Sequence, residues 1–435
     1  MKKVLCWLLF IIISLINISV LAAPDASAPK IESAAAILVQ EGSGRVLFEK
    51  NADEKLYPAS TTKMMTALLA VENLDLLATL SASETAIDID RDGSNMGILR
   101  DELLTVEQLL YGLLVCSAND AANVLAEAVA GDIDSFIDLM NQRAQELGMT
   151  NTHFMNAHGY HDQEHYTTAR DLMTLAMTVM ENDMIRTIVA TPVYRIPPTN
   201  RYEEERVFST NNALVNNIKD HRYVYEGAKG IKTGHTSDAG YCLASYAERN
   251  GLGFFCVTMK GEVDYEGNDS FIDTRNLFDY AFKEFAMVNV ADTNEIVATH
   301  DVKWAKADDQ AVLSAVSPLE VLLPKRYDSA LLTNQITMEE KIVAPVKKGD
   351  VLGKVEYFYD GEAIGSVDLA ATKDVRRSIS KMIFQTLWRL IFNAWVMVPL
   401  GIIVLILILR SVNEAKKQRR EREKRRQQFR RDFYR

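Results

Sequence analysis

Ser60 and Lys63 stand in a Ser-x-x-Lys pattern at the start of an apolar helical pattern. Pro58 interrupts regular structure just before them, and the spacing of three residues places both side chains on one face of the helix. A serine hydroxyl becomes a nucleophile when a neighbouring base removes its proton, and lysine can be that base only if burial or nearby charge keeps it neutral near pH 7. By itself the pattern more often marks a helix-capping serine with a solvated lysine, so its meaning depends on residues further along the chain.

Two further short polar elements come later, in a defined order. Ser117 and Asn119 stand in a Ser-Ala-Asn run, in a loop between two predicted helices. The third element ends a predicted strand and consists of Lys232, Thr233, Gly234 and His235. Each element alone could be a helix cap or a strand-end turn. Together and in this order they match the signature of penicillin-binding proteins and class A β-lactamases. This match favours a single active site over three unrelated motifs that occur by chance.

The chain resembles the serine-type D-alanyl-D-alanine carboxypeptidases, the low-molecular-weight penicillin-binding proteins, over about residues 30–285. The stretches that carry the resemblance beyond the three elements are 93–96, 117–120, 151–154, 158–159, 168–171 and 230–236. The resemblance implies an α+β fold with a penicillin-binding/β-lactamase-like transpeptidase domain, in which an antiparallel sheet is packed with helices. It also implies a small all-β C-terminal domain.

The resemblance also implies the catalytic roles. Ser60 would attack the carbonyl between two D-alanines and form an acyl-enzyme, Lys63 would accept the serine proton, and Ser117 would relay a proton to the leaving amine. Water would then hydrolyse the ester, so that the net reaction removes the last D-alanine of the peptidoglycan pentapeptide. Penicillin would acylate the same serine and leave slowly.

The remaining residues of the signature would bind the substrate. Asn119 would position the peptide and the catalytic lysine. Lys232 would keep that lysine neutral by like-charge repulsion and, with Thr233, bind the terminal carboxylate. The N–H groups of His235 and of the nucleophile would form the oxyanion hole, and the edge strand through Gly234 would pair with the extended substrate.

The hydrophobic pattern predicts the elements that position these residues. Short strands alternate with turns at both ends of a first domain, residues 30–286, and a helical block lies between them, which favours one mostly antiparallel sheet packed on helices. The predicted strands are 35–40, 45–49, 193–196, 229–233, 239–247 and 254–260, and the clearest helices after the first are 135–147, 169–180 and 271–285. Residues 288–371 show short strands with turn signals and are predicted to form a separate small β domain.

Both ends of the chain carry membrane-related patterns. Residues 1–23 are typical of a signal peptide, with two lysines, an apolar run and small residues before an expected cleavage after Ala22 or Ala23. Residues 376–389 predict an amphipathic helix on the membrane surface, and residues 390–409 predict a membrane-spanning helix. Residues 410–435 hold 12 basic and 4 acidic residues in a chain of net charge −11. Positive charge after the span predicts a single-pass protein of the bacterial cytoplasmic membrane, with a cytoplasmic tail and an extracytoplasmic body.

Cofactors and metals are not expected. Three cysteines, Cys116, Cys242 and Cys256, remain after signal removal, and the odd number argues against a disulfide framework. A hairpin turning at residues 250–251 would pair Cys242 with Met259 and Cys256 with Ser245, which excludes a bridge between the two cysteines. The histidines of residues 158–165 lack the tight ligand spacing of zinc sites. The expected partners are the peptidoglycan stem peptide, β-lactams and the membrane, but no nucleic acid.

Two other functions remain open. A β-lactamase would carry Ser-Asp-Asn as its second element and a water-activating glutamate in the loop before the third, whereas this chain has Ser-Ala-Asn and a loop with His158 and Gly159. A membrane-anchored sensor would bind peptidoglycan or a β-lactam without turnover. The complete set of candidate catalytic residues argues against a loss of catalysis.

Overall fold

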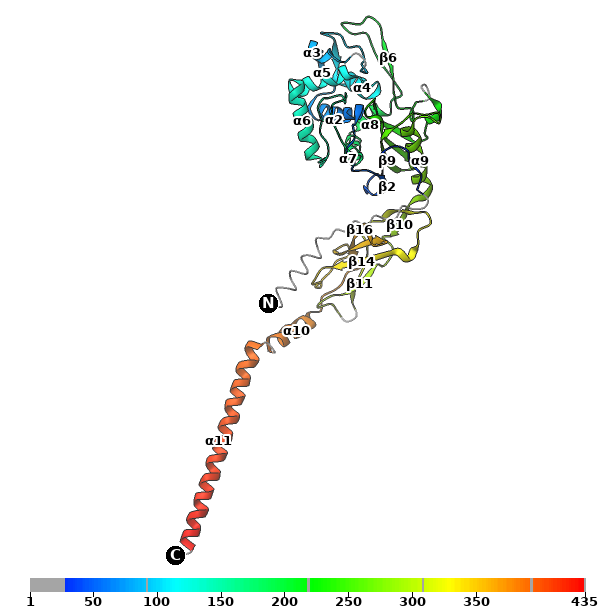
Figure 1. Ribbon diagram of the computed structural model, residues 1–435. Helices are drawn as coiled ribbons and strands as arrows, with labels where there is room; N and C mark the ends of the chain where they lie inside the picture. Colours follow the sequence, from blue (N-terminus) through cyan, green and yellow to red (C-terminus); the bar gives the residue numbers. More distant parts are fainter. Residues whose placement is uncertain (1–27, 91–92, 217–219, 307–308, 392–393, 434–435) are drawn as a thin grey trace. The chain divides into compact units, whose positions relative to one another are not determined.

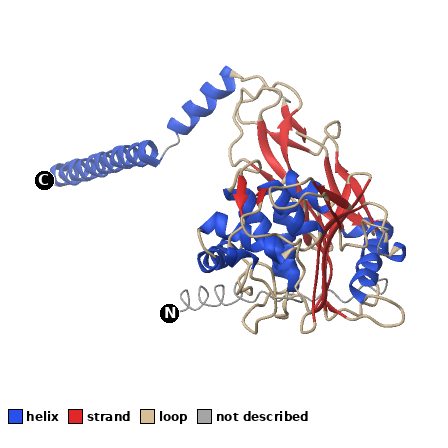
Figure 2. Ribbon diagram, turned by 90° about the horizontal axis from the view of Figure 1, so that it is seen from above, coloured by secondary structure: helices blue, strands red, loops and turns tan. Residues whose placement is uncertain are grey.

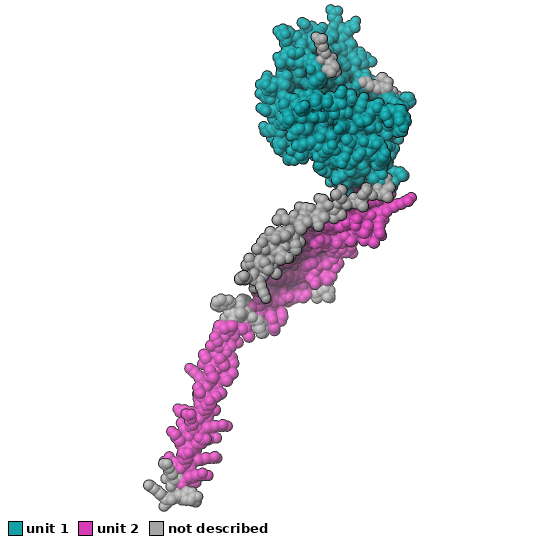
Figure 3. All heavy atoms as spheres, viewed as in Figure 1, with its two compact units in different colours: residues 1–286 teal, residues 287–435 magenta. Residues whose placement is uncertain are grey.

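The computed structural model describes residues 28–90, 93–216, 220–306, 309–391 and 394–433 of the 435-residue chain (Figure 1). Two compact units divide the chain, Met1–Ala286 and Met287–Arg435 (Figure 3). The predicted signal peptide, residues 1–23, lies outside the described residues.

A five-stranded antiparallel sheet organises the first unit, with the strand order β2-β1-β9-β8-β7. Its strands are β1 (Ala35–Gln40), β2 (Val46–Lys50), β7 (Ala228–Thr236), β8 (Gly240–Arg249) and β9 (Leu252–Gly261). All six residues of β1 are buried, as expected for an interior strand covered on both faces. The predicted strands of this sheet are confirmed, although β7 is longer than expected and includes Gly234 and His235.

Helices cover both faces of the sheet (Figure 2). Helix α9 (Asp269–Glu284) packs on β8 and β9, where the Cys256 thiol lies 3.9 Å from the Thr274 hydroxyl. Residues of β9 that alternate with Cys256, such as Val257, belong instead to the core that the other helices share. The predicted packing of one antiparallel sheet against helices is confirmed.

The helical block holds the main apolar core. Its helices are α2 (Lys63–Asn73), α4 (Val106–Val115), α5 (Asn119–Ala130), α6 (Ile133–Glu146), α7 (Ala169–Val179) and α8 (Asp183–Val189). The first eight residues of α2 are all buried, which is typical of a helix surrounded by protein on every side. Helix α4 begins with a capping box, because the Thr105 side chain accepts from the Gln108 N–H and the Gln108 side chain accepts from the Thr105 N–H.

Short elements complete the first unit. They are the 3-10 turns η1 (Ala59–Thr62) and η2 (His221–Tyr223), helix α3 (Glu84–Ile87) and the strands β3 (Thr79–Ser81), β4 (Leu103–Thr105), β5 (Val193–Ile196) and β6 (Arg206–Ser209). The β5–β6 hairpin is attached to the start of β4 by an ion pair between Arg206 and the fully buried Glu102, the residue before that strand.

The β8–β9 hairpin has the predicted register over most of its length, and Ser245 pairs with Cys256 as expected. The register shifts by one residue between Tyr241 and Leu243, so Cys242 lies at an irregularity of the ladder and not in the predicted pair with Met259. The shift coincides with a positive φ of 55° at Lys260 in the facing strand. The three cysteines of the described residues are free.

The second unit begins with an all-β fold. A five-stranded sheet has the order β11-β12-β16-β15-β14, and β10 pairs with β13. The elements are β10 (Phe285–Ala291), β11 (Ala298–Asp301), β12 (Gln310–Ala315), β13 (Leu319–Pro324), η3 (Ser329–Leu331), β14 (Leu332–Met338), β15 (Val351–Tyr359) and β16 (Glu362–Ala371). Its small apolar core is separate from that of the first unit. The predicted small all-β domain is confirmed.

Two helices end the second unit, α10 (Ile379–Ile391) and α11 (Ala394–Phe433). Within the described residues, the segment Met397–Arg430 of α11 is long and apolar enough to cross a membrane. The same helix continues into the basic tail. The α+β fold class with a C-terminal candidate membrane helix therefore agrees with the prediction.

Candidate active site

Ser60 lies in the 3-10 turn η1 and not in the α-helix that the sequence predicts from this point. The reason is local, because Ala59 has a positive φ of 46° and the turn must tighten before the α-helix starts at Lys63. The Thr61 hydroxyl donates to the Pro58 carbonyl at 2.7 Å, and the Thr62 hydroxyl donates to the Ala59 carbonyl at 2.8 Å. These bonds fix the turn that presents the serine.

The Lys63 side chain is fully buried beneath the turn. Its Nζ lies 2.9 Å from Ser60 Oγ and donates to the His158 carbonyl at 2.7 Å. Burial, followed by the positive charge of Lys232, lowers the pKa of Lys63 well below its ordinary value of 10.5. A neutral amine that gives one hydrogen to a carbonyl keeps a lone pair that can accept the serine proton. The geometry therefore suits Lys63 as a general base.

The loop of residues 156–161 supplies the carbonyl that orients this lysine. Gly159 has a φ of +84°, and a Cβ at this position would lie 1.9 Å from the Ala59 carbonyl oxygen. Only glycine therefore allows the loop to approach the turn η1 so closely. His158 and Gly159 belong to the family resemblance, but this role could not be predicted, because a backbone carbonyl leaves no signature in residue type.

A buried histidine supports the same turn. His165 Nδ1 accepts from the Met155 N–H at 3.2 Å, so its Nε2 carries the hydrogen that faces the Thr62 hydroxyl at 2.9 Å. Burial lowers the pKa of His165 to about 4 and that of His158 to about 3, which keeps both rings neutral at ordinary pH.

Within the described residues, no group of three or more His, Cys, Asp or Glu side chains could hold a metal ion.

Ser117 and Lys232 form a second pair. Ser117 lies between α4 and α5 with a positive φ of 67°, and Lys232 reaches it from the edge strand β7. Lys232 Nζ donates to Ser117 Oγ at 3.0 Å and to the Thr233 carbonyl at 2.8 Å. Burial lowers the pKa of Lys232 from 10.5 to about 7. Near neutral pH the protonated and neutral forms of Lys232 are therefore both populated.

Asn119 begins helix α5, and its N–H donates to the Ser94 carbonyl at 2.8 Å. The next residue, Asp120, is buried and accepts from the N–H groups of Met96 and Ile98 at 2.9–3.2 Å. Asp120 thereby holds the loop that carries residues 93–94 against the site. In the sequence Asp120 is only the last residue of the stretch 117–120 that carries part of the family resemblance. Its role in anchoring the loop becomes visible only in the fold.

Gly234 brings the edge strand β7 against the turn η1. A Cβ at Gly234 would lie 2.9 Å from the Pro58 carbonyl oxygen and 3.0 Å from the Ser60 nitrogen. Among the described strands, β7 is hydrogen-bonded only to β8, so its other edge borders the site. An unpaired strand edge can accept an extended peptide.

A cavity of about 440 Å³ opens above these residues. Its lining consists of Ser60, Gly93, Ser94, Asn119, Gly159, Tyr160, His161, His235, Thr236, Ser237 and Asp238. Three predicted site residues, Ser60, Asn119 and His235, therefore face the cavity. Three other predicted site residues are buried and do not line the cavity: Lys63, Ser117 and Lys232. Lys63 is hydrogen-bonded to Ser60 in the cavity wall, and Lys232 is hydrogen-bonded to Ser117. The structure brings the three sequence elements together.

Cys116 precedes Ser117 but is unsuited to nucleophilic chemistry. Burial raises the pKa of its thiol to about 12, and the Sγ donates to the Gly112 carbonyl at 3.2 Å. Burial also raises the pKa of Cys242 to about 11. A thiol that stays protonated is a poor nucleophile.

A family model of D-alanyl-D-alanine carboxypeptidases matches residues 22–263, which is more than half of the chain. The chain belongs to the D-alanyl-D-alanine carboxypeptidase family. A second model, of the C-terminal domain of penicillin-binding protein 5, matches residues 285–377. The predicted family and the predicted enzyme class, a serine-type D-Ala-D-Ala carboxypeptidase, are confirmed.

Relatives of this carboxypeptidase cover most of its length. D-alanyl-D-alanine carboxypeptidase DacF of Bacillus subtilis is 30% identical over 354 residues, which cover 80% of this chain and 87% of DacF. Penicillin-binding protein 5 of Haemophilus influenzae has a solved structure that matches with a TM-score of 0.63 at 26% identity, over 80% of this chain and 99% of that one. The Streptomyces K15 DD-transpeptidase matches with a TM-score of 0.54 at 30% identity, over 59% of this chain and 99% of its own.

Proposed function

We propose that this chain is a membrane-anchored carboxypeptidase that removes the terminal D-alanine from peptidoglycan pentapeptides through an acyl-enzyme on Ser60. The observation that carries the proposal is the placement of Lys63 Nζ, which is buried, lies 2.9 Å from Ser60 Oγ and is oriented by the His158 carbonyl. A base of this kind is what a serine nucleophile needs.

Acylation would begin with transfer of the Ser60 proton to Lys63. The serine oxygen bonds to the carbonyl carbon of the penultimate D-alanine, and the carbonyl oxygen takes up negative charge. The N–H groups of Ser60 and His235 lie on the two elements that meet at the cavity, the nucleophile turn and β7, and would stabilise this oxyanion. The C–N bond then breaks and free D-alanine leaves.

The leaving amine needs a proton at this point. Ser117 would supply it and be reprotonated through Lys232, whose Nζ is 3.0 Å away. In the ground state a cationic Lys232, with Thr233, would attract the terminal carboxylate of the substrate. Asn119 at the cavity wall would hold the peptide, and the free edge of β7 through Gly234 would align it. Water afterwards hydrolyses the ester on Ser60.

β-Lactams would acylate the same serine, because their strained amide presents a carbonyl and a carboxylate in a similar arrangement. The covalent complex would persist for as long as water fails to attack the ester. A β-lactamase needs a carboxylate that activates this water, and the only carboxylate that lines the cavity within the described residues is Asp238, whose side chain is 55% exposed. The lining therefore favours slow hydrolysis of the β-lactam ester on Ser60, and a carboxypeptidase over a β-lactamase.

The domain organisation belongs to the same proposal. Residues 1–23 would be a cleaved signal peptide, 30–286 the catalytic domain, and 288–371 a small β domain that spaces it from the membrane. Residues 376–389 would lie on the outer membrane surface, 390–409 would span the bilayer, and 410–435 would form a cytoplasmic tail. The apolar residues 397–409 of α11 and the basic residues that follow in the same helix support this topology.

The test combines labelling and turnover on the full chain in detergent. A fluorescent penicillin is offered to the wild-type protein and to Ser60→Ala, and D-alanine release from a D-Ala-D-Ala peptide is followed in parallel. The proposal expects both signals in the wild type and neither in the variant. Labelling without release would favour the sensor function, and rapid loss of the label would favour a β-lactamase. Absence of labelling would exclude the acyl-serine assignment.

A further inference from the structure

The active-site cavity extends beyond the end of strand β7, past the residues that the proposed chemistry uses. Thr236 is the last residue of this strand, and Ser237 and Asp238 of the following loop also line the cavity. Asp238 is the only carboxylate of the lining within the described residues, and its side chain is 55% exposed. None of the proposed proton transfers uses it. This end of the cavity therefore carries a negative charge that the proposed reaction leaves without a role.

The direction of the bound peptide decides which of its residues comes near Asp238. Under the proposed function the terminal carboxylate lies by Lys232 and Thr233, and the carbonyl of the penultimate D-alanine lies by the His235 N–H. The peptide therefore runs antiparallel to β7, with the penultimate residue opposite His235. The residue before it, the third of the stem peptide, then lies opposite Thr236. A long side chain at this position reaches the facing residue on the diagonal, roughly 7–8 Å away, and Asp238 is two residues beyond Thr236.

The loop that carries Asp238 is constrained by its neighbours. Residues 237–239 connect β7 to β8, and Thr236 is paired with Gly240 across them. The Thr236 hydroxyl accepts from the Ala239 N–H at 3.1 Å inside the loop. Gly240 has a φ of +64°, and a Cβ there would lie 2.9 Å from a carbonyl oxygen of β9. These contacts hold the loop, and Asp238 with it, at the end of the edge strand.

A second wall of this part of the cavity comes from the loop of residues 156–161. The His161 ring stands edge-on to the Tyr57 ring, with 4.7 Å between the ring centres. His161 Nδ1 is shielded from solvent, has no hydrogen-bond partner among the described residues and lies 3.9 Å from Asp238 Oδ2. This distance is too long for a hydrogen bond, so the carboxylate remains available to another donor.

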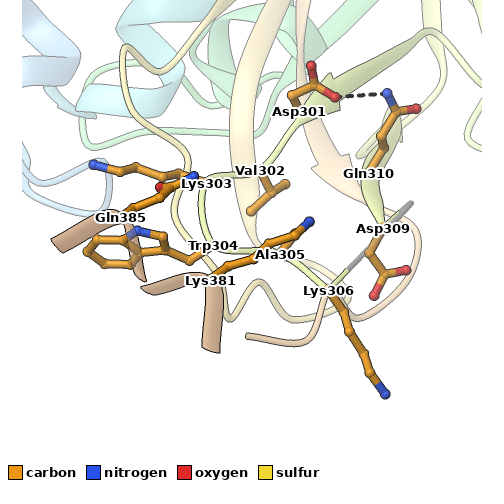
Figure 4. A pocket seen from close by; sticks show the side chains of 10 residues that line it. All are labelled: Asp301, Val302, Lys303, Trp304, Ala305, Lys306, Asp309, Gln310, Lys381 and Gln385. Atoms are coloured by element: carbon orange, nitrogen blue, oxygen red, sulfur yellow. Dashed lines mark hydrogen bonds between the residues drawn. The ribbon is translucent and has the colours of Figure 1, made fainter. Parts of the chain in front are cut away.

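A hollow in the second unit differs in this respect. Figure 4 shows its lining side chains, among which Lys303, Lys306 and Lys381 point away from one another. Cations that diverge cannot bind one anion together. In the active-site cavity His161 and Asp238 instead approach each other from two loops, so they can enclose one small charged group.

Side chains of opposite charge stand on the two sides of His235 in the chain. Lys232, the cation that would attract the terminal carboxylate, comes three residues before it, and Asp238 comes three residues after it. A peptide with a carboxylate at its C-terminus and an ammonium group on the side chain two residues earlier presents the complementary charges in the matching order. Charge complementarity of this kind contributes more to specificity than to affinity.

We propose that Asp238 binds the side-chain ammonium group of the third stem-peptide residue, and that the enzyme therefore selects a diamino acid at this position. The proposal rests on the proposed function, which sets the direction of the peptide. The ammonium group donates to the Asp238 carboxylate at the end of the cavity, while the backbone of the same residue lies opposite Thr236. Lysine and other diamino acids share this chemistry, so Asp238 distinguishes them from neutral and acidic residues.

The experiment measures kcat/KM for D-alanine release by the full chain in detergent. The substrates are N-acetylated pentapeptides that end in D-Ala-D-Ala and differ only at residue three, which is lysine, norleucine or glutamate. Norleucine keeps the side-chain carbons of lysine and lacks its ammonium group. The test variants are Asp238→Asn and Asp238→Lys. The matched controls are Asp138→Asn and Asp138→Lys, at an exposed position of α6 outside the cavity.

The wild type and both controls should prefer the lysine peptide over the norleucine peptide by a factor of about three to ten. In Asp238→Asn this ratio should fall to about one, because the amide carries no charge. Asp238→Lys should prefer the glutamate peptide over the lysine peptide. Each ratio compares two peptides on one protein, so a general loss of folded enzyme cancels, and structural damage alone cannot reverse a preference.

Two results would overturn the proposal. One is equal kcat/KM for the lysine and norleucine peptides in the wild type, and the other is a lysine preference that survives in Asp238→Asn. No release of D-alanine from any of the three peptides by the wild type would instead refute the proposed function, on which the assignment of Asp238 depends. A fluorescent penicillin counts the reactive protein in each preparation beforehand.

Discussion

Lys232 Nζ lies 3.0 Å from Ser117 Oγ, although the two residues are 115 positions apart in the chain. The contact joins the edge strand β7 to the loop between α4 and α5. A second serine–lysine pair belongs to the same site, in which Lys63 Nζ lies 2.9 Å from Ser60 Oγ. Each candidate catalytic serine thus has its own buried lysine. Under the proposed function, one pair would remove the proton from the attacking serine, and the other pair would deliver a proton to the leaving group.

Replacing Ser117 with alanine should slow turnover more than it weakens binding. The variant loses the proton path to the leaving amine, so kcat for D-alanine release should fall about 10²- to 10⁴-fold while KM changes little. Steady-state kinetics on a D-Ala-D-Ala peptide measure both constants. A change confined to KM would instead make Ser117 a binding residue.

The pH dependence should be bell-shaped in kcat/KM. Lys63 must be neutral to accept a proton, so activity should rise with pH as this lysine loses its proton at a pKa well below 10.5. Lys232 must be cationic to attract the carboxylate, so activity should fall as pH rises through its pKa of about 7.

The variant Lys232→Arg tests the assignment of the alkaline limb. A guanidinium stays protonated throughout this range, so the fall in kcat/KM on the alkaline side should disappear or move upward by several pH units even if the overall rate is lower. An alkaline limb that remains in place in the arginine variant would contradict the role of Lys232. The acid limb should be the same in both proteins.

Gly159→Ala should abolish most activity. Its added Cβ would lie 1.9 Å from the Ala59 carbonyl oxygen, and the loop that orients Lys63 would have to withdraw from the nucleophile turn. The matched control is Gly148→Ala, which has a similar φ of +77° but open space around the added methyl group. Both variants carry the backbone cost of about 1 kcal/mol, so a difference in penicillin acylation rate isolates the steric contact. Equal rates would show that the contact is unimportant.

Lys232→Met should stabilise the folded protein near neutral pH while it removes activity. Burial lowers the pKa of Lys232 to about 7, so between pH 7 and 10.5 the unfolded chain binds a proton that the folded chain has released. Stability therefore rises with pH across this window, and at pH 7 the lysine costs on the order of a few kcal/mol. Thermal unfolding should show a higher Tm for the variant at pH 7 and a smaller gain at pH 10. A lower Tm at pH 7 would mean that the bonds to Ser117 and Thr233 outweigh the burial cost.

Asp120→Asn should raise KM more than it lowers kcat. The carboxylate accepts N–H bonds from Met96 and Ile98, and an amide keeps only one acceptor oxygen for them. Residues 93–94 of the cavity wall should then lose their fixed position. Asp134→Asn, in the first turn of α6 and outside the cavity, is the control. An unchanged KM with normal folding would contradict the anchoring role.

The sequence predicts most of what depends on side-chain type. The spacing of Ser60 and Lys63 predicts that they share one face, and the alternating strands predict the sheet. Sequence could not predict that the His158 carbonyl orients Lys63, because every residue has a carbonyl and only the tertiary fold selects one. Nor could it predict the register shift at Cys242, since a single inserted residue changes the pairing without changing the hydrophobic alternation.

The pairing of β1 with β9 has a consequence for the order in which the molecule forms. Strand β1 is complete at residue 40, but its interior neighbour β9 begins at residue 252, so more than two hundred residues must be synthesised before the sheet can close. Contacts so distant along the chain slow folding and leave an apolar strand edge open meanwhile. A nascent or truncated chain that stops short of β9 should therefore neither react with penicillin nor resist proteolysis, and catalytic competence should arise in one late step.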